Sequence, residues 1–399
     1  VLQNERGPRI VVAGVGGAGC NAVDNMINAG LSGVDFVVIN TDAQALNRCR
    51  TERKVQIGRN ITRGLGTGAN PSLGEQAAIE DRGLILEAIG DADLVFITCG
   101  LGGGTGTGAS PIIADIAREN GSLTVSIVTK PFDFEGSVRR RHAERGQSDI
   151  RSRVDTLITI PNQRLIKIID ENTPLVEAFR VSDGVLLQCV RSISDLITLP
   201  GLINLDFADI KTIMENTGGA VMGVGFGKGE NKASQAFAQA SSSPLMEEVV
   251  LEGAKGVLIN VTGGPDMTLY EINKAIEEQV NTKVDPEANI IFGTVIDENL
   301  IDQIKVTILA TGFTRSEKIP EPIRSGQKEG TLTTMKIQPS QYPTDLDEPA
   351  YLKKKRPEIQ REPQPVAAEH LGPDSDPNDL PFPKLDRHDF LPSIFGDMK

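Results

Sequence analysis

The stretch Gly100-Leu101-Gly102-Gly103-Gly104-Thr105-Gly106-Thr107-Gly108 follows an apolar, strand-like run at residues 93–99 and precedes a helical pattern at residues 110–119. Six of its nine residues are glycine and two are threonine. Glycine permits backbone conformations that turn several N–H groups to one side, where they can hold phosphate oxygens, and threonine hydroxyls add further donors. The stretch therefore predicts a phosphate-binding loop at the carboxyl end of a strand.

Two more glycine-rich loops occur earlier in the chain. Gly14-Val15-Gly16-Gly17-Ala18-Gly19 ends a predicted strand at residues 9–15, and Gly64-Leu65-Gly66-Thr67-Gly68-Ala69-Asn70-Pro71 precedes another helical pattern. The carboxyl ends of parallel strands share one edge of a sheet, so the three loops are expected to converge on one crevice. A glycine loop followed by a helix N-terminus favours an anionic ligand there.

The first loop alone would suggest a nicotinamide-dependent oxidoreductase. It matches G-x-G-x-x-G, and Asp42 follows at roughly the distance of a ribose-binding acid. Three loops, however, suit a nucleotide with a longer phosphate chain, and no catalytic His or Lys–Tyr arrangement is found in the second half. The chain also lacks G-x-x-x-x-G-K-[ST], so it is not a P-loop NTPase. Backbone amides and a metal ion are expected to hold the phosphates.

The first half of the chain alternates strand and helix patterns. The predicted strands are residues 9–15, 34–40, 93–99, 123–129 and 156–161, and the predicted helices are residues 21–29, 73–89, 110–119 and 138–151. This alternation favours an α/β fold in which helices cover both faces of a parallel, Rossmann-like sheet.

A long helical pattern then separates this half from a second one. It begins at Pro174, which suits a first helical turn, and stops before Pro200-Gly201. The second half is predicted to be an α+β domain with strands at 221–225, 256–261, 289–294 and 305–310 and helices at 231–240 and 269–281. The predicted division is thus residues 1–173, a nucleotide-binding domain; 174–200, a central helix; 201–313, a second domain; and 314–399, a tail.

Composition limits the remaining possibilities. The 399 residues carry a net charge of −13, which disfavours nucleic acid and anionic membrane surfaces as direct partners. The four cysteines are widely spaced, which indicates reduced thiols rather than disulfides or a zinc site. No apolar run reaches the ~18–20 residues of a membrane span, and we expect a cytoplasmic protein. Of 23 prolines, 13 lie after Phe313, which predicts a mostly disordered tail.

The heptapeptide Gly102-Gly103-Gly104-Thr105-Gly106-Thr107-Gly108 resembles the signature of the tubulin/FtsZ family of GTPases. The resemblance extends over about residues 9–313, is strongest for the FtsZ branch, and includes residues 40–46, 129–136, 262–264 and 285–293. It implies GTP and Mg²⁺ as ligands, hydrolysis of GTP to GDP and phosphate, and head-to-tail polymerisation into the filament of bacterial cell division. A GTP-binding homologue without hydrolysis is the alternative within the family.

Most predicted nucleotide-binding residues carry over from this resemblance. They are Gly17, Ala18, Gly19, Cys20, Asn21, Asp42, Gly68, Ala69, Gly102, Gly103, Gly104, Thr105, Gly106, Thr107, Glu135, Arg139, Asn162, Phe179 and Asp183. The resemblance implies that Glu135 and Arg139 contact the ribose, that Asp183 accepts the guanine N–H donors, and that Phe179 stacks on the base. By composition alone, Arg139 and Asp183 would be charges on helix surfaces. No side chain is predicted to bind a metal directly.

A second group of candidate site residues lies beyond the long helix. Asn204, Asp206 and Asp209 match the loop that, in the FtsZ branch, completes the active site of the next subunit. A helix of ~25 residues is about 37 Å long, so one molecule is not expected to bring these residues to its own nucleotide. The alternative is a helix N-cap at this position, and both roles can hold together.

The tail holds a possible partner-binding peptide. Residues 345–354 (Asp-Leu-Asp-Glu-Pro-Ala-Tyr-Leu-Lys-Lys) resemble the FtsZ peptide that docks membrane-tethering division proteins, which would bring the chain to the division site. An ordinary linker is the alternative. A second apolar cluster, residues 389–395, follows near the end.

Overall fold

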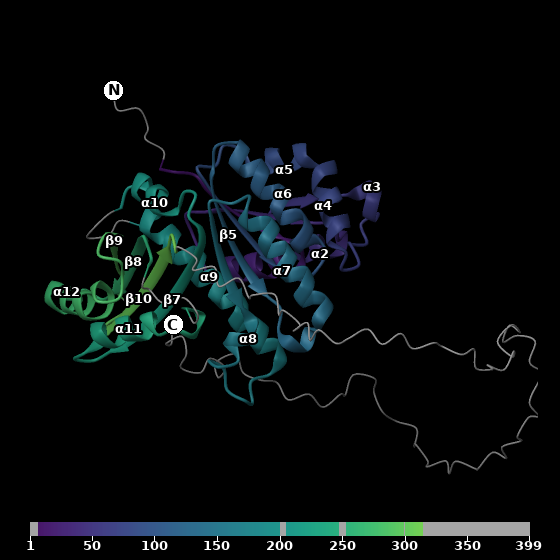
Figure 1. Ribbon diagram of the computed structural model, residues 1–399. Coiled ribbons are helices and arrows are strands. Elements are labelled where there is room, and N and C mark those ends of the chain that lie inside the picture. Colours follow the sequence, from purple (N-terminus) through teal and green to yellow (C-terminus); the bar gives the residue numbers. More distant parts are fainter. Residues whose placement is uncertain (1–6, 200–204, 247–252, 299, 314–399) are drawn as a thin grey trace, which may run out of the picture. The chain divides into compact units, whose positions relative to one another are not determined.

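The computed structural model describes residues 7–199, 205–246, 253–298 and 300–313. All of them belong to one compact unit. Within it, ten strands form a single sheet in the order β3-β2-β1-β4-β5-β6-β7-β10-β8-β9 (Figure 1). Their bounds are β1 Ile10–Val15, β2 Asp35–Asn40, β3 Arg53–Gln56, β4 Leu94–Gly100, β5 Leu123–Lys130, β6 Thr156–Pro161, β7 Gly218–Lys228, β8 Gly256–Gly263, β9 Asn289–Ile296 and β10 Gln303–Thr311.

The strands from β3 to β7 are parallel, which confirms the predicted α/β fold with a mainly parallel sheet. Strand β10 is antiparallel to both of its neighbours, β7 and β8, and β9 pairs in parallel with β8. One sheet therefore runs through both predicted halves of the chain. The division at Pro174 and Gly201 stays a prediction.

Helices connect these strands. They are α1 Gly16–Asn28, α2 Ala43–Arg48, α3 Arg59–Thr62, α4 Pro71–Glu80, α5 Arg82–Ile89, α6 Thr105–Glu119, α7 Ser137–Arg151, α8 Asn162–Leu165, α9 Leu175–Thr198, α10 Phe207–Met214, α11 Lys232–Ser241 and α12 Leu269–Ile276. Single helical turns lie at η1 Asp133–Glu135, η2 Pro244–Met246 and η3 Glu277–Asn281, the last being a π turn that extends α12.

Several elements differ from the sequence-based prediction, among them the short helices α2, α3 and α8, which were not predicted. The predicted helix at 73–89 is two helices, α4 and α5, which meet at Asp81. Helices α1 and α6 begin five residues earlier than predicted, at Gly16 and Thr105, so parts of two glycine loops are helical first turns. Strand β3 was not predicted, because its sequence Arg-Lys-Val-Gln is short and polar at the edge of the sheet.

The sheet is buried on both faces in the first half. Side chains of β1 alternate between two apolar clusters: Ile10 and Val12 pack with α1 and α9, whereas Val11 and Ala13 pack with α4 to α7. A third cluster joins β8 and β10 to α11 and α12. Burial on both faces explains why β1 reads as a continuous apolar run rather than an alternating one.

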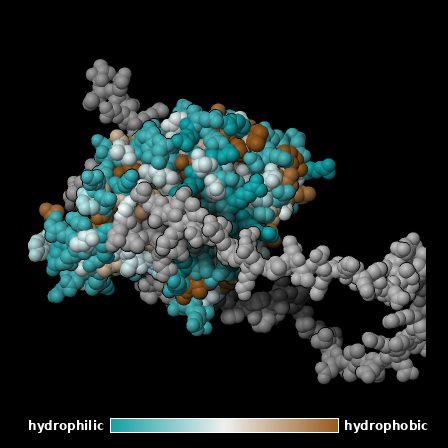
Figure 2. Space-filling model, in the orientation of Figure 1, coloured by the Kyte–Doolittle hydropathy of each residue, from teal (hydrophilic) through white to brown (hydrophobic). Residues whose placement is uncertain are grey.

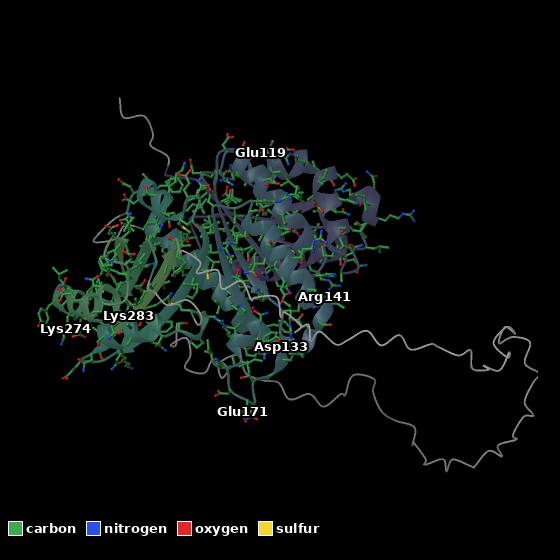
Figure 3. The ribbon with its side chains drawn as sticks, in the orientation of Figure 1. Glu119, Asp133, Arg141, Glu171, Lys274 and Lys283 are labelled. Carbon is green, nitrogen blue, oxygen red and sulfur yellow. The ribbon has the colours of Figure 1, made fainter. Side chains whose placement is uncertain are left out.

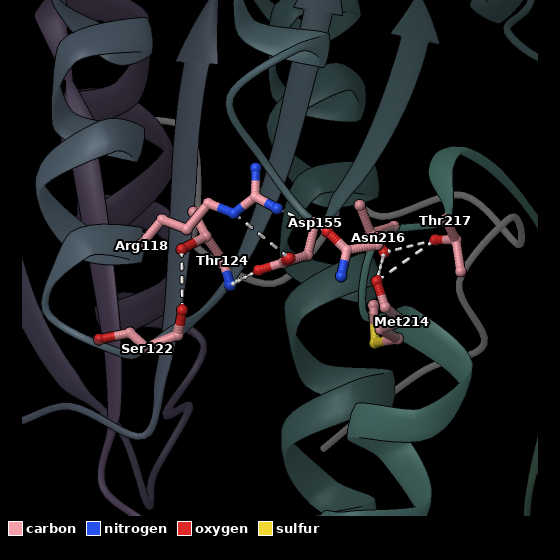
Figure 4. A network of polar contacts seen from close by, with 8 residues as sticks. Arg118, Ser122, Thr124, Asp155, Met214, Asn216 and Thr217 are labelled. Carbon is pink, nitrogen blue, oxygen red and sulfur yellow. Dashed lines mark hydrogen bonds and ion pairs between the residues drawn. The ribbon is translucent and has the colours of Figure 1, made fainter.

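A polar network fixes α10 to the amino-terminal edge of the sheet (Figure 4). The Asp155 carboxylate accepts a hydrogen bond from the Thr124 N–H (2.9 Å) and lies 3.8 Å from Arg118. Arg118 also donates to the Asn216 side chain, and Thr156 Oγ1 donates to the Met214 carbonyl. These contacts hold the carboxyl end of α10 against the first residues of β5 and β6.

Candidate functional site

A cavity of about 660 Å³ opens at the carboxyl edge of the sheet. The three glycine loops meet there, together with the segments after β2, β5 and β6 and the first turns of α9. Fifteen of the predicted nucleotide-binding residues line it: Gly17, Ala18, Asn21, Asp42, Gly68, Ala69, Gly103, Gly104, Thr105, Gly106, Glu135, Arg139, Asn162, Phe179 and Asp183. The topology thus brings these residues together from seven separate segments of the chain.

Glycine is required where the loops touch. A Cβ on Gly104 would lie 1.9 Å from the Thr67 Oγ1, and Gly16, at φ +70°, would place a Cβ 2.8 Å from the Gly106 nitrogen. Any side chain at either position would push two loops apart. The sequence is glycine-rich here because three backbone segments share one small space.

Two helices point uncapped N-termini at the cavity. Helix α1 starts after Val15 and α6 starts after Gly104, and neither N-cap residue offers a side-chain hydrogen bond to the first turn. In contrast, the Asn70 side chain caps α4 by accepting from the Ser72 N–H. The free N–H groups and positive dipole ends of α1 and α6 are suited to an anion such as a phosphate chain.

A rim of the cavity is built by η1 and α7. Arg139 forms an ion pair with Glu135 on the same side of the cavity, and the other Glu135 oxygen accepts from the Phe132 N–H at 2.9 Å. Nearby, Asp133, labelled in Figure 3, pairs with Arg140 at 2.7 Å. These ion pairs fix the segment from which Glu135 and Arg139 face the cavity.

The part of the cavity lined by α8 and α9 carries the Phe179 ring, the Asn162 amide and the Asp183 carboxyl group. Phe179 packs edge-on against Phe132, with ring centroids 5.4 Å apart. Ser182 Oγ donates to Asn162 Oδ1 at 2.8 Å, which leaves the Asn162 amino group free to donate to a ligand. Burial raises the pKa of the Asp183 carboxyl to about 7. A ligand that donates hydrogen bonds to Asp183 would favour its ionised form.

Four predicted residues are not among those that line this cavity. Gly19 and Cys20 are buried inside α1, where the Cys20 Sγ accepts from the Asn40 side chain at 3.7 Å. The Gly102 N–H donates to Thr107 Oγ1 at 2.9 Å, so this pair shapes the signature loop from within. Thr107 faces a second, smaller cavity next to His142.

Several residues of the lining were not predicted as site residues. They are Val15, Asn40, Ala45, Leu65, Gly66, Thr67, Gly100, Leu101, Thr129, Pro131 and Ser182. Most of them lie inside the loops and segments already identified from the sequence. A prediction that included every residue of each loop would have contained them. Only Ser182 gave no signal, because its role depends on Asn162, 20 residues away.

Asp206 and Asp209 lie far from this cavity, and Asn204 lies outside the described residues. Leu196, near the C-terminal end of α9, and Leu205 both lie next to Gly293, because a Cβ on Gly293 would contact both side chains. Asp206, which follows Leu205 and begins α10, is therefore close to the C-terminal end of α9. Phe179 is 17 residues (196 − 179) before Leu196, or about 26 Å along the helix. In Figure 1, α8 beside the cavity lies near the bottom of the view and α10 toward the upper left.

The two aspartates also perform a local task. Asp206 is the N-cap of α10, and its N–H donates to the Asp209 Oδ2 at 3.3 Å. Both side chains belong to exposed residues. They are therefore available to a ligand or partner outside this molecule while they cap the helix.

Two general properties concern the described residues only. No helix among them has the length and apolar character needed to cross a membrane. Nor do they contain a group of three or more His, Cys, Asp or Glu side chains that could hold a metal ion.

Comparison with family models finds two matches. Residues 9–170 match the GTPase domain of the tubulin/FtsZ family, and residues 218–314 match the C-terminal domain of the FtsZ family. The cell division protein FtsZ of Caulobacter vibrioides, in strains NA1000 / CB15N and ATCC 19089 / CIP 103742 / CB 15, is 52% identical over 339 residues. The match covers 84% of this chain and 66% of those relatives, just under two thirds of their length.

Solved structures show the same likeness. An FtsZ dimer from M. jannaschii superposes with a TM-score of 0.73 at 46% identity, covering 78% of this chain and 90% of the other. CetZ1 from Haloferax volcanii superposes with a TM-score of 0.68 over 78% of this chain and 97% of the other. At 20% identity, the latter shows the shared fold alone.

Proposed function

Because this chain belongs to the tubulin/FtsZ family, we propose that it binds GTP in the cavity and hydrolyses it at a site completed by a second copy of the chain. The observation that carries this proposal is the separation of two sets of groups. The anion-binding loops gather at the carboxyl edge of the sheet, whereas Asp206 and Asp209 belong to α10, about a helix length away.

The cavity fits GTP at both ends. The uncapped N-termini of α1 and α6 offer N–H groups to a phosphate chain. At the other end, the Asp183 carboxylate can accept the N1–H and N2–H₂ donors of guanine, which adenine does not present, and Phe179 can stack on the base. Glu135 and Arg139, on the rim between the two ends, can hydrogen-bond the ribose.

We propose Mg²⁺ as the cofactor. Mg²⁺ keeps several waters and is commonly bound through substrate phosphates with few protein ligands, which agrees with a cavity whose lining contains only three carboxylates. Among the lining residues, Thr67 and Thr105 lie within the glycine-rich loops and Asp42 bridges to Leu65 of one of them, so their side chains offer oxygen groups beside the proposed phosphate site. When bound, the ion would neutralise charge on the terminal phosphates.

The second copy would supply what the cavity lacks. Hydrolysis needs a water held in line with the γ-phosphate. In a head-to-tail stack, Asp206 and Asp209 of one copy would face the cavity of the next, where a carboxylate can orient that water and accept its proton. Such a contact does not close on itself, so it generates a filament.

The cavity rim has the apolar character of a surface that another copy can cover. Leu65 is 81% exposed, and Phe134, Val138 and Val176 are each more than half exposed beside residues that line the cavity. Figure 2 shows a patch of apolar side chains near the position of α8. By the same family argument, we propose that the filament acts at the cytoplasmic division site and that residues 345–354 bind a tethering partner.

The decisive experiment measures GTP hydrolysis per subunit against protein concentration, with ATP as the control nucleotide. Specific activity is expected to be near zero below a threshold concentration and to rise steeply above it, because each active site needs two copies. A constant activity per subunit would mean that one molecule holds the whole site. Binding of GTP without hydrolysis at any concentration would favour a non-hydrolysing homologue.

Affinity for GTP is expected to fall at low pH. The pKa of the Asp183 carboxyl is about 7 in the free protein, and guanine donors favour the ionised form, so binding below pH 7 must release a proton. Affinity should therefore weaken by up to about tenfold per pH unit below 7 and level off above it. Equilibrium titration of GTP between pH 5.5 and 8.5 measures this slope; a flat profile would place Asp183 away from the base.

A further inference from the structure

Three threonine hydroxyls form a chain beneath the signature loop. Thr41 Oγ1 lies 2.7 Å from Thr105 Oγ1, which in turn lies 3.4 Å from Thr67 Oγ1. Thr105 and Thr67 line the cavity. Thr41 is fully buried and is not among the lining residues. The chain therefore leads from a residue behind the cavity wall to two hydroxyls that face the ligand.

The backbone around Thr41 is fixed from two sides. Its N–H donates to the Asn40 Oδ1 at 2.8 Å, and its carbonyl accepts from the Thr62 hydroxyl at 3.4 Å. The next residues extend this attachment, since the Ala43 N–H donates to the Gly64 carbonyl at 3.1 Å. Thr41 is thus held between the end of β2 and the start of the glycine-rich loop at residues 64–71.

The direction of the first hydrogen bond follows from proton counting. In the part of the chain that the structure describes, Thr105 Oγ1 is the one partner of the Thr41 hydroxyl. Each hydroxyl has a single proton, and a buried hydroxyl that does not donate loses free energy. When Thr41 donates to Thr105, the Thr105 proton is free for another acceptor. An anionic ligand is a stronger acceptor than the neutral Thr67 hydroxyl at 3.4 Å.

We propose that Thr41 is a positioning residue for the phosphate site. It donates to Thr105 and thereby directs the Thr105 hydroxyl proton into the cavity, toward a phosphate oxygen of the nucleotide. This inference rests on the proposed function, because it takes GTP as the ligand. A chain of hydroxyls aligned in this way polarises each member, so the final donor is stronger than an isolated threonine.

The test compares variants that separate the hydroxyl of Thr41 from its methyl group. Thr41→Val removes the hydroxyl and keeps the branched shape, whereas Thr41→Ser keeps the hydroxyl and removes the methyl. GTP affinity, measured by equilibrium binding to the full chain, is expected to fall about tenfold in Thr41→Val and to stay within about twofold in Thr41→Ser. The value of kcat/KM should follow the affinity in both.

Two controls separate this role from packing. Thr98 is fully buried in strand β4, which leads into the signature loop, and its hydroxyl has no partner among the described residues, so Thr98→Val should leave GTP affinity unchanged. Thr41→Ala and Thr41→Ser both lack the methyl group and differ only in the hydroxyl. This second pair gives the same comparison if Thr41→Val does not fold, as judged by thermal unfolding without nucleotide.

The outcomes are distinct. The inference would be overturned if Thr41→Val bound GTP with the parent's affinity. It would also be overturned if Thr41→Ser and Thr41→Ala lost GTP affinity equally, because the hydroxyl would then have no separate effect. A parent chain that binds no GTP would overturn the proposed function before any variant is compared. If the parent chain binds GTP and Thr41→Val binds it with the same affinity, only this inference is overturned and the proposed function stands.

Discussion

Replacing Asp209 with alanine is expected to lower GTP turnover about 100-fold or more while GTP affinity stays within about twofold. Asp209 is exposed and lies in the first turn of α10, and it makes no contact with the nucleotide cavity of its own molecule. Under the proposed shared site, its loss would remove a group that acts only on the nucleotide of a neighbour. Turnover above the assembly threshold and equilibrium GTP binding measure the two quantities separately.

A control variant accounts for the capping role of this residue. Asp209 accepts a hydrogen bond from the Asp206 N–H, so alanine is expected to cost about 1 kcal/mol of stability. Glu215, an exposed carboxylate, is the C-cap residue at the other end of α10 and has no place in the proposed site. Glu215→Ala should retain full turnover.

Mixing two inactive variants gives a sharper test of a shared site. Asp209→Ala keeps an intact cavity, and a variant with a damaged base pocket, Asp183→Ala, keeps an intact Asp209. In an equal mixture, about a quarter of head-to-tail interfaces combine the two intact halves, so part of the activity should return. If Asp209→Ala alone retains full activity, or if the mixture stays inactive while both variants assemble, the proposed trans site is wrong.

Asp183→Asn is expected to weaken GTP binding roughly 100-fold or more, since two hydrogen bonds to a charged acceptor contribute about 1.5–3 kcal/mol each. The amide oxygen can accept one guanine donor, but the amide nitrogen carries protons that face the second donor. Xanthine has an oxygen in place of the guanine amino group and would suit the amide. The variant should therefore prefer XTP to GTP, which competition binding measures directly.

Asp195→Asn is the matched control for this change. Asp195 lies 12 residues further along α9, and burial raises its pKa to about 6, but it is not among the residues that line the cavity. Its replacement should alter neither GTP affinity nor the choice between GTP and XTP. Unchanged guanine preference in Asp183→Asn would mean that another group selects the base.

The sequence alone predicted most strands in the first half of the fold and the position of the glycine-rich loops. Continuous apolar runs such as β1 predict buried parallel strands, and the glycine clusters between strands and helices predict anion-binding turns, because both signals are local in the chain. The predicted α/β class with a mainly parallel sheet is confirmed. Helix starts were less accurate: α1 and α6 begin within the glycine loops, since tertiary contacts offset the low helix propensity of glycine.

Tertiary structure alone decided which residues meet. Nothing local to Thr41 indicates a contact with Thr105, 64 residues later, or to Ser182 a hydrogen bond with Asn162. The raised pKa of Asp183 likewise depends on burial, which no single position in the sequence reports. The sequence therefore determined which segments carry glycine-rich backbone and acidic side chains. Their convergence at one edge of the sheet, and the position of α10 at the other, follow from strand order and polarity, which are properties of the whole sheet.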